Sequence, residues 1–147
     1  LDMVNVRGGL PTRNWQTGSF PNEERINGMA LTENVLKDRV ACFACPIACG
    51  RVSKIKTGKW AGKEGEGPEF ESVVLLGSST DLGDLNAITM ANFLCNEYGI
   101  DTISAGSIIA FAMECYERGI LSKEDTGGLD LSFGNTTDYL KLIGPFI

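Results

Sequence analysis

The sequence predicts a mostly α, multi-helical domain with long ordered loops and at most a short β element. Two segments, Asp84–Gly99 and Asp101–Gly119, carry apolar residues at helical spacing between an aspartate and a glycine. Residues 1–30 are rich in glycine, proline, asparagine and threonine, which is typical of loops. Only one short segment alternates apolar and polar residues as a strand does. The 147 residues fit one domain.

The first 30 residues are expected to form an ordered loop. Trp15 and Phe20 favour burial and should anchor this loop on the core. A helix is expected next, near Thr32 to Arg39, with Thr32 as its N-cap. The chain begins with leucine instead of an initiator methionine, so we expect it to be a piece of a longer polypeptide.

The middle of the chain predicts the β element. Arg51 to Lys56 alternates like a short strand, and Thr57 to Gly62 is typical of a turn. An acidic, glycine-punctuated segment, Glu64 to Glu71, then leads into the apolar stretch Ser72 to Leu76.

Two strong helices follow, joined by a two-residue connection as a helical pair. Asp84 and Asp101 are their expected N-caps, and Gly99 and Gly119 their ends. The residues expected to face inward are Leu85, Ile88, Ala91, Leu94, Cys95 and Tyr98 in the first helix, and Ile103, Ile108, Phe111, Ala112 and Cys115 in the second. After them we expect a turn at Ser122–Asp125, a loop at Gly127–Gly134 and a last helix at Thr137–Ile143.

Charge and composition exclude several classes of protein. The net charge is −6, with 19 acidic and 13 basic residues, which is the opposite of a nucleic-acid-binding balance. No apolar run approaches the ~20 residues that span a bilayer, so we expect no membrane partner. The chain has no histidine, which excludes within it a histidine general base and a His-ligated zinc site.

Three of the five cysteines form a compact motif, Cys42-x2-Cys45-Pro46-x2-Cys49. An odd number of clustered cysteines is a poor disulfide framework and favours a metal site in a reducing cytoplasm. Thiolates at this spacing are typical ligands of an iron–sulfur cluster. The alternatives are buried free cysteines or a zinc site; a thioredoxin-like motif is weaker because no βαβ pattern surrounds it.

A cluster or a zinc ion would need a fourth ligand. Cys95 and Cys115 both lie on apolar helix faces, where cysteine is usually a packing residue. We therefore expect the fourth ligand to lie outside this chain. Small and apolar residues flank the motif and are expected to shield a cluster; they are Val40, Ala41, Phe43, Ala44, Ile47 and Ala48.

These residues resemble the tungsten-dependent aldehyde:ferredoxin oxidoreductase family. Besides the Ala41–Gly50 cysteine segment, the similar blocks, in family order, are Leu10–Asn14, Gly67–Glu71, Leu76–Ser78, Ala91–Asn92, Gly99–Ser104 and Gly128–Asn135. The resemblance implies a tungsten (or molybdenum) ion held by two pterins, where an aldehyde and water become a carboxylate. It also implies a [4Fe-4S] cluster that passes the electrons singly to ferredoxin. Cys42, Cys45 and Cys49 match three of its ligands, and the fourth lies beyond residue 147 in the family.

The resemblance assigns further roles. Glu71 matches a glutamate beside the tungsten that activates water or accepts a proton; the alternative is a solvated acidic residue. Asn96, Ile100 and Asp101 match the Asp-x-x-Gly-Leu-Asp/Cys element that holds a pterin, with Asn96 in place of the first aspartate. An amide oxygen can still accept hydrogen bonds, though more weakly than a carboxylate. The alternative for Asp101 is a helix cap.

Two other family features are not predicted here. Asp125–Asp130 also fits the pterin pattern, but its position matches a different family block. A glutamate and a histidine form the family's metal bridge between subunits; Met90 occupies the glutamate position and the chain has no histidine.

Residues 1–147 thus correspond to the middle, cluster-binding domain of the family. The pterin-binding N-terminal domain and the last domain would lie elsewhere, so we expect the isolated chain to be inactive. The expected partners are ferredoxin, the remaining domains of the parent enzyme and, through the surfaces that those domains would cover, a second copy of the chain. The alternatives are a stand-alone iron–sulfur electron-transfer module and a non-catalytic remnant.

Overall fold

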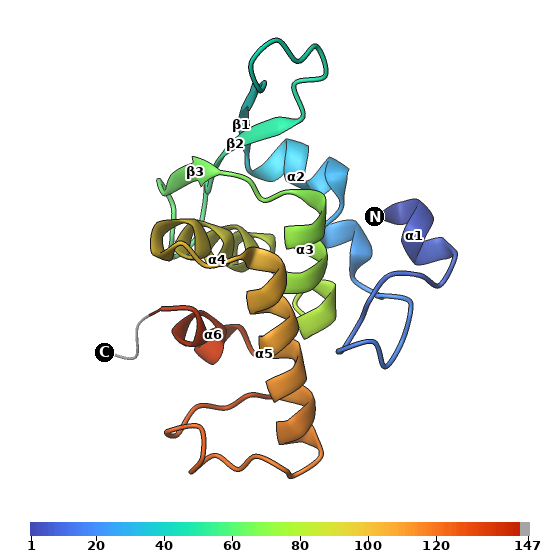
Figure 1. Ribbon diagram of the computed structural model, residues 1–147, viewed down its shortest axis with the longest axis vertical. Helices are drawn as coiled ribbons and strands as arrows, with labels where there is room; N and C mark the ends of the chain where they lie inside the picture. Colours follow the sequence, from blue (N-terminus) through green and yellow to red (C-terminus); the bar gives the residue numbers. More distant parts are fainter. Residues whose placement is uncertain (145–147) are drawn as a thin grey trace.

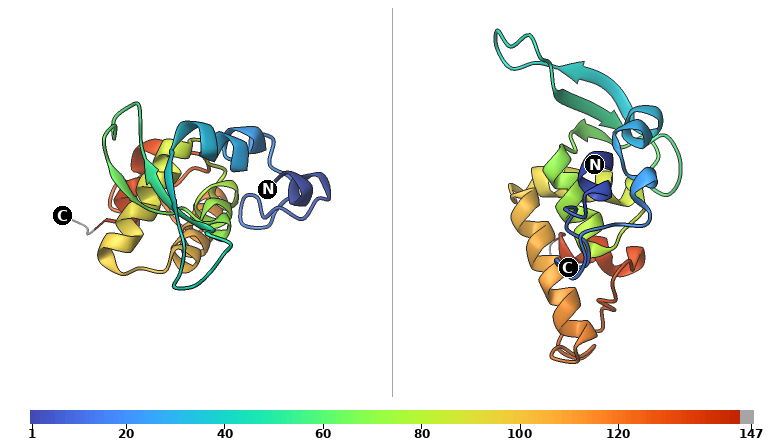
Figure 2. Two further views of the ribbon diagram at one scale, coloured as in Figure 1. Left: turned by 90° about the horizontal axis from the view of Figure 1, so that it is seen from above. Right: turned by 90° about the vertical axis from the view of Figure 1, so that its right-hand side faces the viewer.

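The computed structural model describes residues 1–144 and consists of helices with one small antiparallel sheet toward one end of the molecule (Figures 1 and 2). The helices are α1 (Asp2–Val6), α2 (Gly28–Asn34), α3 (Phe70–Leu76), α4 (Leu85–Tyr98), α5 (Thr102–Glu117) and α6 (Thr136–Tyr139), with 3-10 turns at Glu23–Arg25, Ser78–Thr80 and Leu140–Leu142. The strands are β1 (Leu36–Val40), β2 (Gly50–Lys54) and β3 (Glu64–Glu66), adjacent in that order. This architecture is compatible with the predicted mostly α protein with a short β element, and that element is a three-stranded sheet where one strand was predicted.

The core lies around α3, with α5 packed along it and α4 crossing beside it (Figure 1). Leu76 of α3 and Ile88 of α4 are fully buried there. The C-terminal helix joins this core through Tyr139, whose hydroxyl donates to the Leu76 carbonyl oxygen at 2.7 Å. This bond is between residues 63 positions apart, so it ties the end of the chain to its centre.

The two long helices begin and end as predicted. The Asp84 carboxylate accepts from the Asn86 and Ala87 amides at the start of α4, and Gly99 ends the helix in the left-handed conformation, with φ +66°. Asp101 caps α5 by accepting from the Ser104 amide at 2.7 Å. Each cap satisfies backbone donors that a helix leaves without partners in its first turn.

The predicted inner face of α5 is wrong. Ile103, Ile108 and Phe111 are 45%, 67% and 62% exposed, and the buried residues are instead Gly106, Ile109, Ala110 and Met113. The reason is the crossing with α3: a Cβ at Gly106 would stand 2.4 Å from the Leu75 carbonyl carbon. The close approach of the two backbones fixes which side of α5 faces inward. Tyr98, expected inward at the end of α4, is also exposed.

The N-terminal predictions are corrected in two places. The helix expected at Thr32–Arg39 is instead α2, which ends at Asn34 and is capped by Asn27. The residues after it, Leu36–Val40, form β1 because they pair with β2. Phe20 is buried as expected, whereas Trp15 is 70% exposed. The 1–30 segment also contains a helix, α1, and a 3-10 turn where only loop was predicted.

Strands β1 and β2 form a hairpin that projects at one end of the longest axis (Figure 2). The predicted strand Arg51–Lys56 corresponds to β2, which begins one residue earlier, at Gly50, and ends two residues earlier, at Lys54. Val40 pairs with Gly50 at the last step of the ladder. A Cβ at Gly50 would stand 2.8 Å from Val40 Cγ2, so glycine permits this closure. The turn expected at Thr57–Gly62 follows and is confirmed.

The C-terminal part follows the sequence prediction closely. Asp125 accepts from the Ser122 amide and hydroxyl, which closes the expected turn. The last helix begins at Thr136 and its final residues, Leu140–Leu142, are 3-10. Over residues 1–144, none of the helices combines the length and the apolar character required to cross a lipid bilayer.

Candidate functional site

The three clustered cysteines lie together on the loop between β1 and β2, which residues 41–49 form. All three are free thiols; Cys42 and Cys49 are exposed and Cys45 is partly exposed. The Cys45 amide donates to the Cys42 carbonyl oxygen at 3.0 Å, which makes Cys42–Cys45 a β-turn. The hairpin thus delivers three soft ligands on one short, solvent-accessible segment.

This donor set suits an iron–sulfur cluster, because such clusters are held by cysteine thiolates. Within residues 1–144, no three His, Cys, Asp or Glu side chains gather around a point where they could share one metal ion. An iron–sulfur cluster does not require its ligands to share one metal ion, because each thiolate binds a different iron atom of the cluster. Three accessible thiols on one loop are therefore compatible with a cluster whose last ligand comes from elsewhere.

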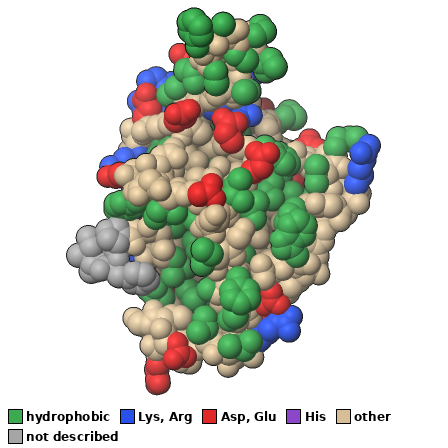
Figure 3. Space-filling model, viewed as in Figure 1, with side chains coloured by type: hydrophobic (Ala, Val, Ile, Leu, Met, Phe, Trp, Pro, Cys, Tyr) green, Lys and Arg blue, Asp and Glu red, His purple; other side chains and the backbone are tan. Residues whose placement is uncertain are grey.

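The apolar shell expected around the cysteines does not close over them. Phe43 is fully exposed and Ile47 is 75% exposed. Apolar side chains accordingly cover the tip of the hairpin in Figure 3. An exposed phenylalanine beside a ligand requires another surface to cover it if the cluster is to be shielded from water.

The two remaining cysteines do not join the loop. Cys95 is completely buried in α4, and burial, together with the charge of Asp101, raises the pKa of its thiol. Cys115 lies near the C-terminal end of α5, at the opposite end of the molecule from the hairpin tip (Figure 1). Cys95 thus has the packing role that the sequence predicted, whereas Cys115 is only partly buried and is not part of the core.

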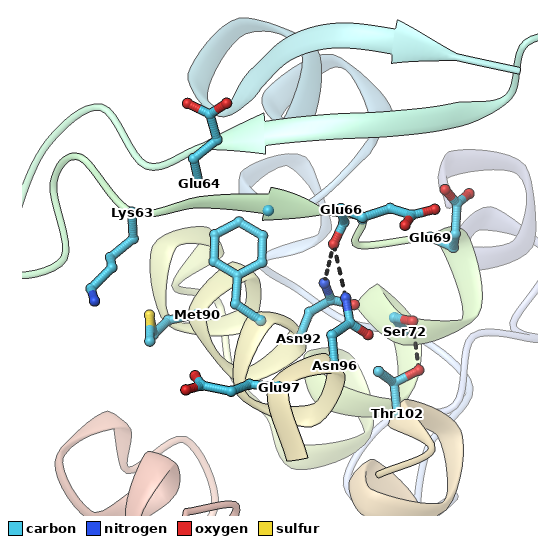
Figure 4. A pocket seen from close by; sticks show the side chains of 13 residues that line it. Lys63, Glu64, Glu66, Glu69, Ser72, Met90, Asn92, Asn96, Glu97 and Thr102 are labelled. Atoms are coloured by element: carbon cyan, nitrogen blue, oxygen red, sulfur yellow. Dashed lines mark hydrogen bonds between the residues drawn. The ribbon is translucent and has the colours of Figure 1, made fainter. Parts of the chain in front are cut away.

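A cleft of about 650 Å³ lies beneath β3, between that strand, α4 and the first residues of α3 and α5 (Figure 4). The residues that line it are Lys63, Glu64, Gly65, Glu66, Gly67, Glu69, Ser72, Met90, Asn92, Phe93, Asn96, Glu97 and Thr102. Four of these carry carboxylates and one is a lysine. The cleft therefore favours a ligand that presents N–H donors or positive charge over an anionic one.

Two asparagines on α4 hold the floor of the cleft to β3. The Asn92 and Asn96 side-chain amides both donate to the Glu66 carbonyl oxygen, at 2.7 and 3.1 Å (Figure 4). Because a carbonyl oxygen can only accept, the Nδ2 atom of Asn96 must face Glu66. Its Oδ1 atom is then available to accept from a ligand. The structure thus places Asn96 in the cleft with an acceptor to offer.

Other cleft residues were not predicted as site residues. The Ser72 and Thr102 hydroxyls hydrogen-bond at 2.7 Å where α3 meets α5. Glu69 is engaged by Arg51 at 2.6 Å. Asn92 is only 3% exposed. The sequence carried one signal for Asn92: it is a polar residue one helical turn before Asn96. The same helix face is otherwise occupied by Ile88, Ala91 and Cys95.

Glu71 lies in the first turn of α3, outside the cleft lining, and its side chain is exposed. It makes no side-chain hydrogen bond or ion pair with any residue of the 1–144 segment. Glu69, two residues earlier, is held by Arg51 instead. The two glutamates therefore differ: Glu69 is engaged by a neighbour, whereas Glu71 has no such partner among residues 1–144.

Ile100 and Asp101 connect α4 to α5 and do not line the cleft. The Ile100 amide donates to the Cys95 carbonyl oxygen at 2.8 Å, which completes the C-terminal cap of α4. Hydrogen bonds from Ser104 hold the pKa of Asp101 below its ordinary value. The helix-cap alternative for Asp101 is thus what the structure shows, and the next residue, Thr102, lines the cleft.

Comparison with known proteins identifies the family to which the sequence is similar. Residues 1–145 match the family described as aldehyde ferredoxin oxidoreductase, domains 2 & 3. A tungsten-containing aldehyde ferredoxin oxidoreductase from Pyrococcus horikoshii is 45% identical over 139 residues, and the equivalent protein from Thermococcus kodakarensis is 43% identical over 137. An aliphatic sulfonate oxidoreductase, WOR-like subunit, from Pyrococcus furiosus is 32% identical over 137. The matches cover 92–93% of this chain but 22% of each relative, so the chain spans about a fifth of their length.

Proposed function

We propose that this chain, which belongs to the aldehyde ferredoxin oxidoreductase family, carries the iron–sulfur loop and part of the pterin site of a larger oxidoreductase. The parent enzyme would oxidise aldehydes to carboxylates and pass the electrons to ferredoxin. The observation that carries the proposal is the exposed loop with Cys42, Cys45 and Cys49, in a chain up to 45% identical to enzymes of that name.

In this proposal the three cysteines hold three corners of a [4Fe-4S] cluster. The cluster, when bound, supplies one-electron transfer between the tungsten centre and ferredoxin. The burial of Cys95 and the distant position of Cys115 support a fourth ligand from outside this chain. The same two observations weigh against the stand-alone electron-transfer module, because that module would need a fourth ligand of its own.

The cleft beneath β3 would receive one pterin of a tungsten (or molybdenum) bis-pterin centre. That centre, when bound, supplies the two-electron oxidation of the aldehyde. Asn96 would accept a hydrogen bond from a pterin N–H through its free Oδ1 atom, and the acidic lining suits such donors. Ile100 and Asp101 would act by fixing the α4–α5 connection that borders this site.

Glu71 would be the residue that handles a proton during the reaction. Its carboxylate is exposed and engaged by no neighbour in the described part of the chain, so both oxygens can accept. It lies at the start of α3, directly before the cleft residue Ser72. A general base needs a carboxylate oxygen that is free to take a proton and must also reach that proton. The unengaged carboxylate of Glu71 supports the first of these two conditions.

An aldehyde is favoured over other substrate classes by the comparisons. The relatives at 42–45% identity are named aldehyde ferredoxin oxidoreductases, whereas the sulfonate oxidoreductase subunit is 32% identical. Because the chain spans a fifth of these proteins, the remaining domains of the parent would complete the site. The isolated chain is then expected to be inactive toward aldehydes.

Anaerobic reconstitution with ferrous iron and sulfide tests the cluster. We add 2-mercaptoethanol, a small thiol that can occupy the fourth coordination position. We expect a [4Fe-4S] EPR signal after reduction, lost in Cys42→Ser, Cys45→Ser and Cys49→Ser and retained in Cys115→Ser, the matched control. Loss in Cys115→Ser would support the stand-alone module. Aldehyde-dependent viologen reduction by the isolated chain would contradict the requirement for further domains.

A further inference from the structure

Two alanines in the cysteine loop have an unusual backbone conformation. Ala44 has φ +57° and Ala48 has φ +49°, so both are left-handed. Each directly precedes a cysteine, Cys45 and Cys49 respectively. Residues with a Cβ adopt this conformation rarely, because the Cβ crowds the following carbonyl oxygen. The conformation therefore occurs where the chain must turn to present the second and third thiols.

The first of these residues lies in a defined turn. Ala44 is the third residue of the Cys42–Cys45 β-turn, and it alone of the two central residues has a positive φ. This is the sign pattern of a type II turn, which usually has glycine or asparagine at that position. Turns of this kind direct backbone N–H groups to one side, an arrangement that recurs at iron–sulfur sites.

The side chains that precede the two alanines do not anchor these conformations in the core. Phe43 and Ile47, the residues before the two alanines, project into solvent. The β1–β2 ladder fixes only the base of the loop, at the Val40–Gly50 pair. Unfavourable backbone conformations persist where other interactions compensate for them, and they concentrate at functional sites. Thiolate–iron bonds would supply that compensation here.

We propose that Ala44 and Ala48 are positioning residues for the cluster: their left-handed conformations turn Cys45 and Cys49 toward the same cluster as Cys42. The inference rests on the proposed function, because it presupposes that the cysteines hold a cluster. It identifies what the two positions require, which is a residue that tolerates positive φ. Glycine satisfies the requirement without steric cost, whereas a β-branched side chain does not.

Substitutions at three alanines of the same loop test the proposal. Ala44→Val and Ala48→Val introduce a β-branched residue at the left-handed positions, and Ala44→Gly and Ala48→Gly remove the Cβ. Ala41→Val is the matched control, because Ala41 lies in the same exposed loop without a positive φ. Each chain is reconstituted with iron, sulfide and 2-mercaptoethanol, and the loss of cluster absorption to a ferrous chelator is timed. Thermal unfolding of the metal-free chains is recorded in parallel.

We expect the two valine variants to lose the cluster about tenfold faster than the unsubstituted chain. The glycine variants and Ala41→Val should retain it as long as the parent does, and all the metal-free chains should unfold at the same temperature. Equal cluster lifetimes in Ala44→Val, Ala48→Val and Ala41→Val would overturn the positioning role alone. Failure of the unsubstituted chain to form any cluster would overturn the proposed cluster site and the positioning role with it.

Discussion

Asn92 and Asn96 donate to the same backbone oxygen, that of Glu66, but they differ in burial. Asn92 is 3% exposed and Asn96 lies at the open side of the cleft. A buried hydrogen bond contributes to stability because its loss is not compensated by water, whereas an exposed one is easily replaced. We therefore assign support of the cleft to Asn92 and contact with a ligand to Asn96.

We predict that Asn92→Ala lowers the free energy of unfolding by about 1–3 kcal/mol. Asn96→Ala should change it by no more than about 0.5 kcal/mol, as is usual for surface substitutions. Urea unfolding of the two variants measures the difference. Equal losses in both would show that Asn96 is a structural residue of the same kind as Asn92, and would remove the argument that its amide is available to a pterin.

Tyr139 makes the free energy of unfolding depend on pH in the alkaline range. Its side chain is completely buried, and this burial, with the nearby Cys95 thiol, raises the pKa of the phenol well above its ordinary value. In the unfolded chain the phenol ionises near pH 10. Above that pH the unfolded state releases a proton that the native state keeps. The stabilising contribution is therefore complete below about pH 10 and is lost as the pH rises toward the native pKa.

We predict that Tyr139→Phe reduces the loss of stability that accompanies a rise in pH above about 10. The variant should be less stable near neutral pH by about 1–3 kcal/mol, because the Leu76 carbonyl oxygen loses its donor. Above pH 10 the difference from the parent should shrink by up to about 1.4 kcal/mol for each pH unit. Denaturant unfolding at several pH values measures both effects. Parallel stability curves for the two chains would contradict this origin of the pH dependence.

At the scale of single elements, helix α5 depends on a glycine in its interior. In an exposed helix, replacing glycine by alanine is stabilising by about 1 kcal/mol. At Gly106 the added Cβ would stand 2.4 Å from the Leu75 carbonyl carbon of α3. The two helices would have to separate, and strained packing of this kind typically costs about 1–3 kcal/mol.

We therefore predict that Gly106→Ala destabilises the chain by about 1–3 kcal/mol, against its helix propensity. Ser107→Ala, at the next position of the same helix, is the control and should be neutral or slightly stabilising. Thermal unfolding followed by circular dichroism compares the two. Stabilisation by Gly106→Ala would mean that the α3–α5 crossing is wider than described.

Elements whose signals are local were predictable from the sequence. The aspartate caps and terminal glycines of α4 and α5 act within a few residues, so their bounds could be read directly. Strand β1 could not, because Leu36–Val40 is held by pairing with residues on the far side of the cysteine loop. The inner face of α5 was misassigned because its apolar residues occur all around the helix, and the contact at Gly106 decides the orientation.

The candidate site divides in the same way. The three cysteines and their shared loop follow from spacing alone, whereas the cleft requires β3, α4 and the starts of α3 and α5 to meet. Asn96 was identified by family resemblance, but its bond to Glu66, 30 residues away, and the contribution of Asn92 emerge only from the folded chain. The left-handed alanines gave no signal, since alanine is not the residue expected at positive φ.

At the scale of the whole molecule, the cysteine loop and the exposed side of α5 present unburied apolar surface. Ile103, Ile108 and Phe111 are each at least 45% exposed along α5, and Figure 3 shows apolar side chains across this face. A helix with apolar residues on all sides is usually buried in a larger protein. The chain spans about a fifth of its relatives, so in a full-length protein further domains would be available to cover this surface.

We predict that the isolated chain self-associates through this face. Ile108→Lys and Phe111→Lys replace exposed side chains, so each should leave the free energy of unfolding nearly unchanged. Each should weaken association by about tenfold or more, because burial of such a side chain contributes about 1.5–3 kcal/mol. Met29→Lys, an exposed apolar residue on α2, is the matched control and should have no effect. Sedimentation velocity over a range of concentrations measures association; a parent chain that stays monomeric, or equal weakening by Met29→Lys, would contradict the assignment of the interface to α5.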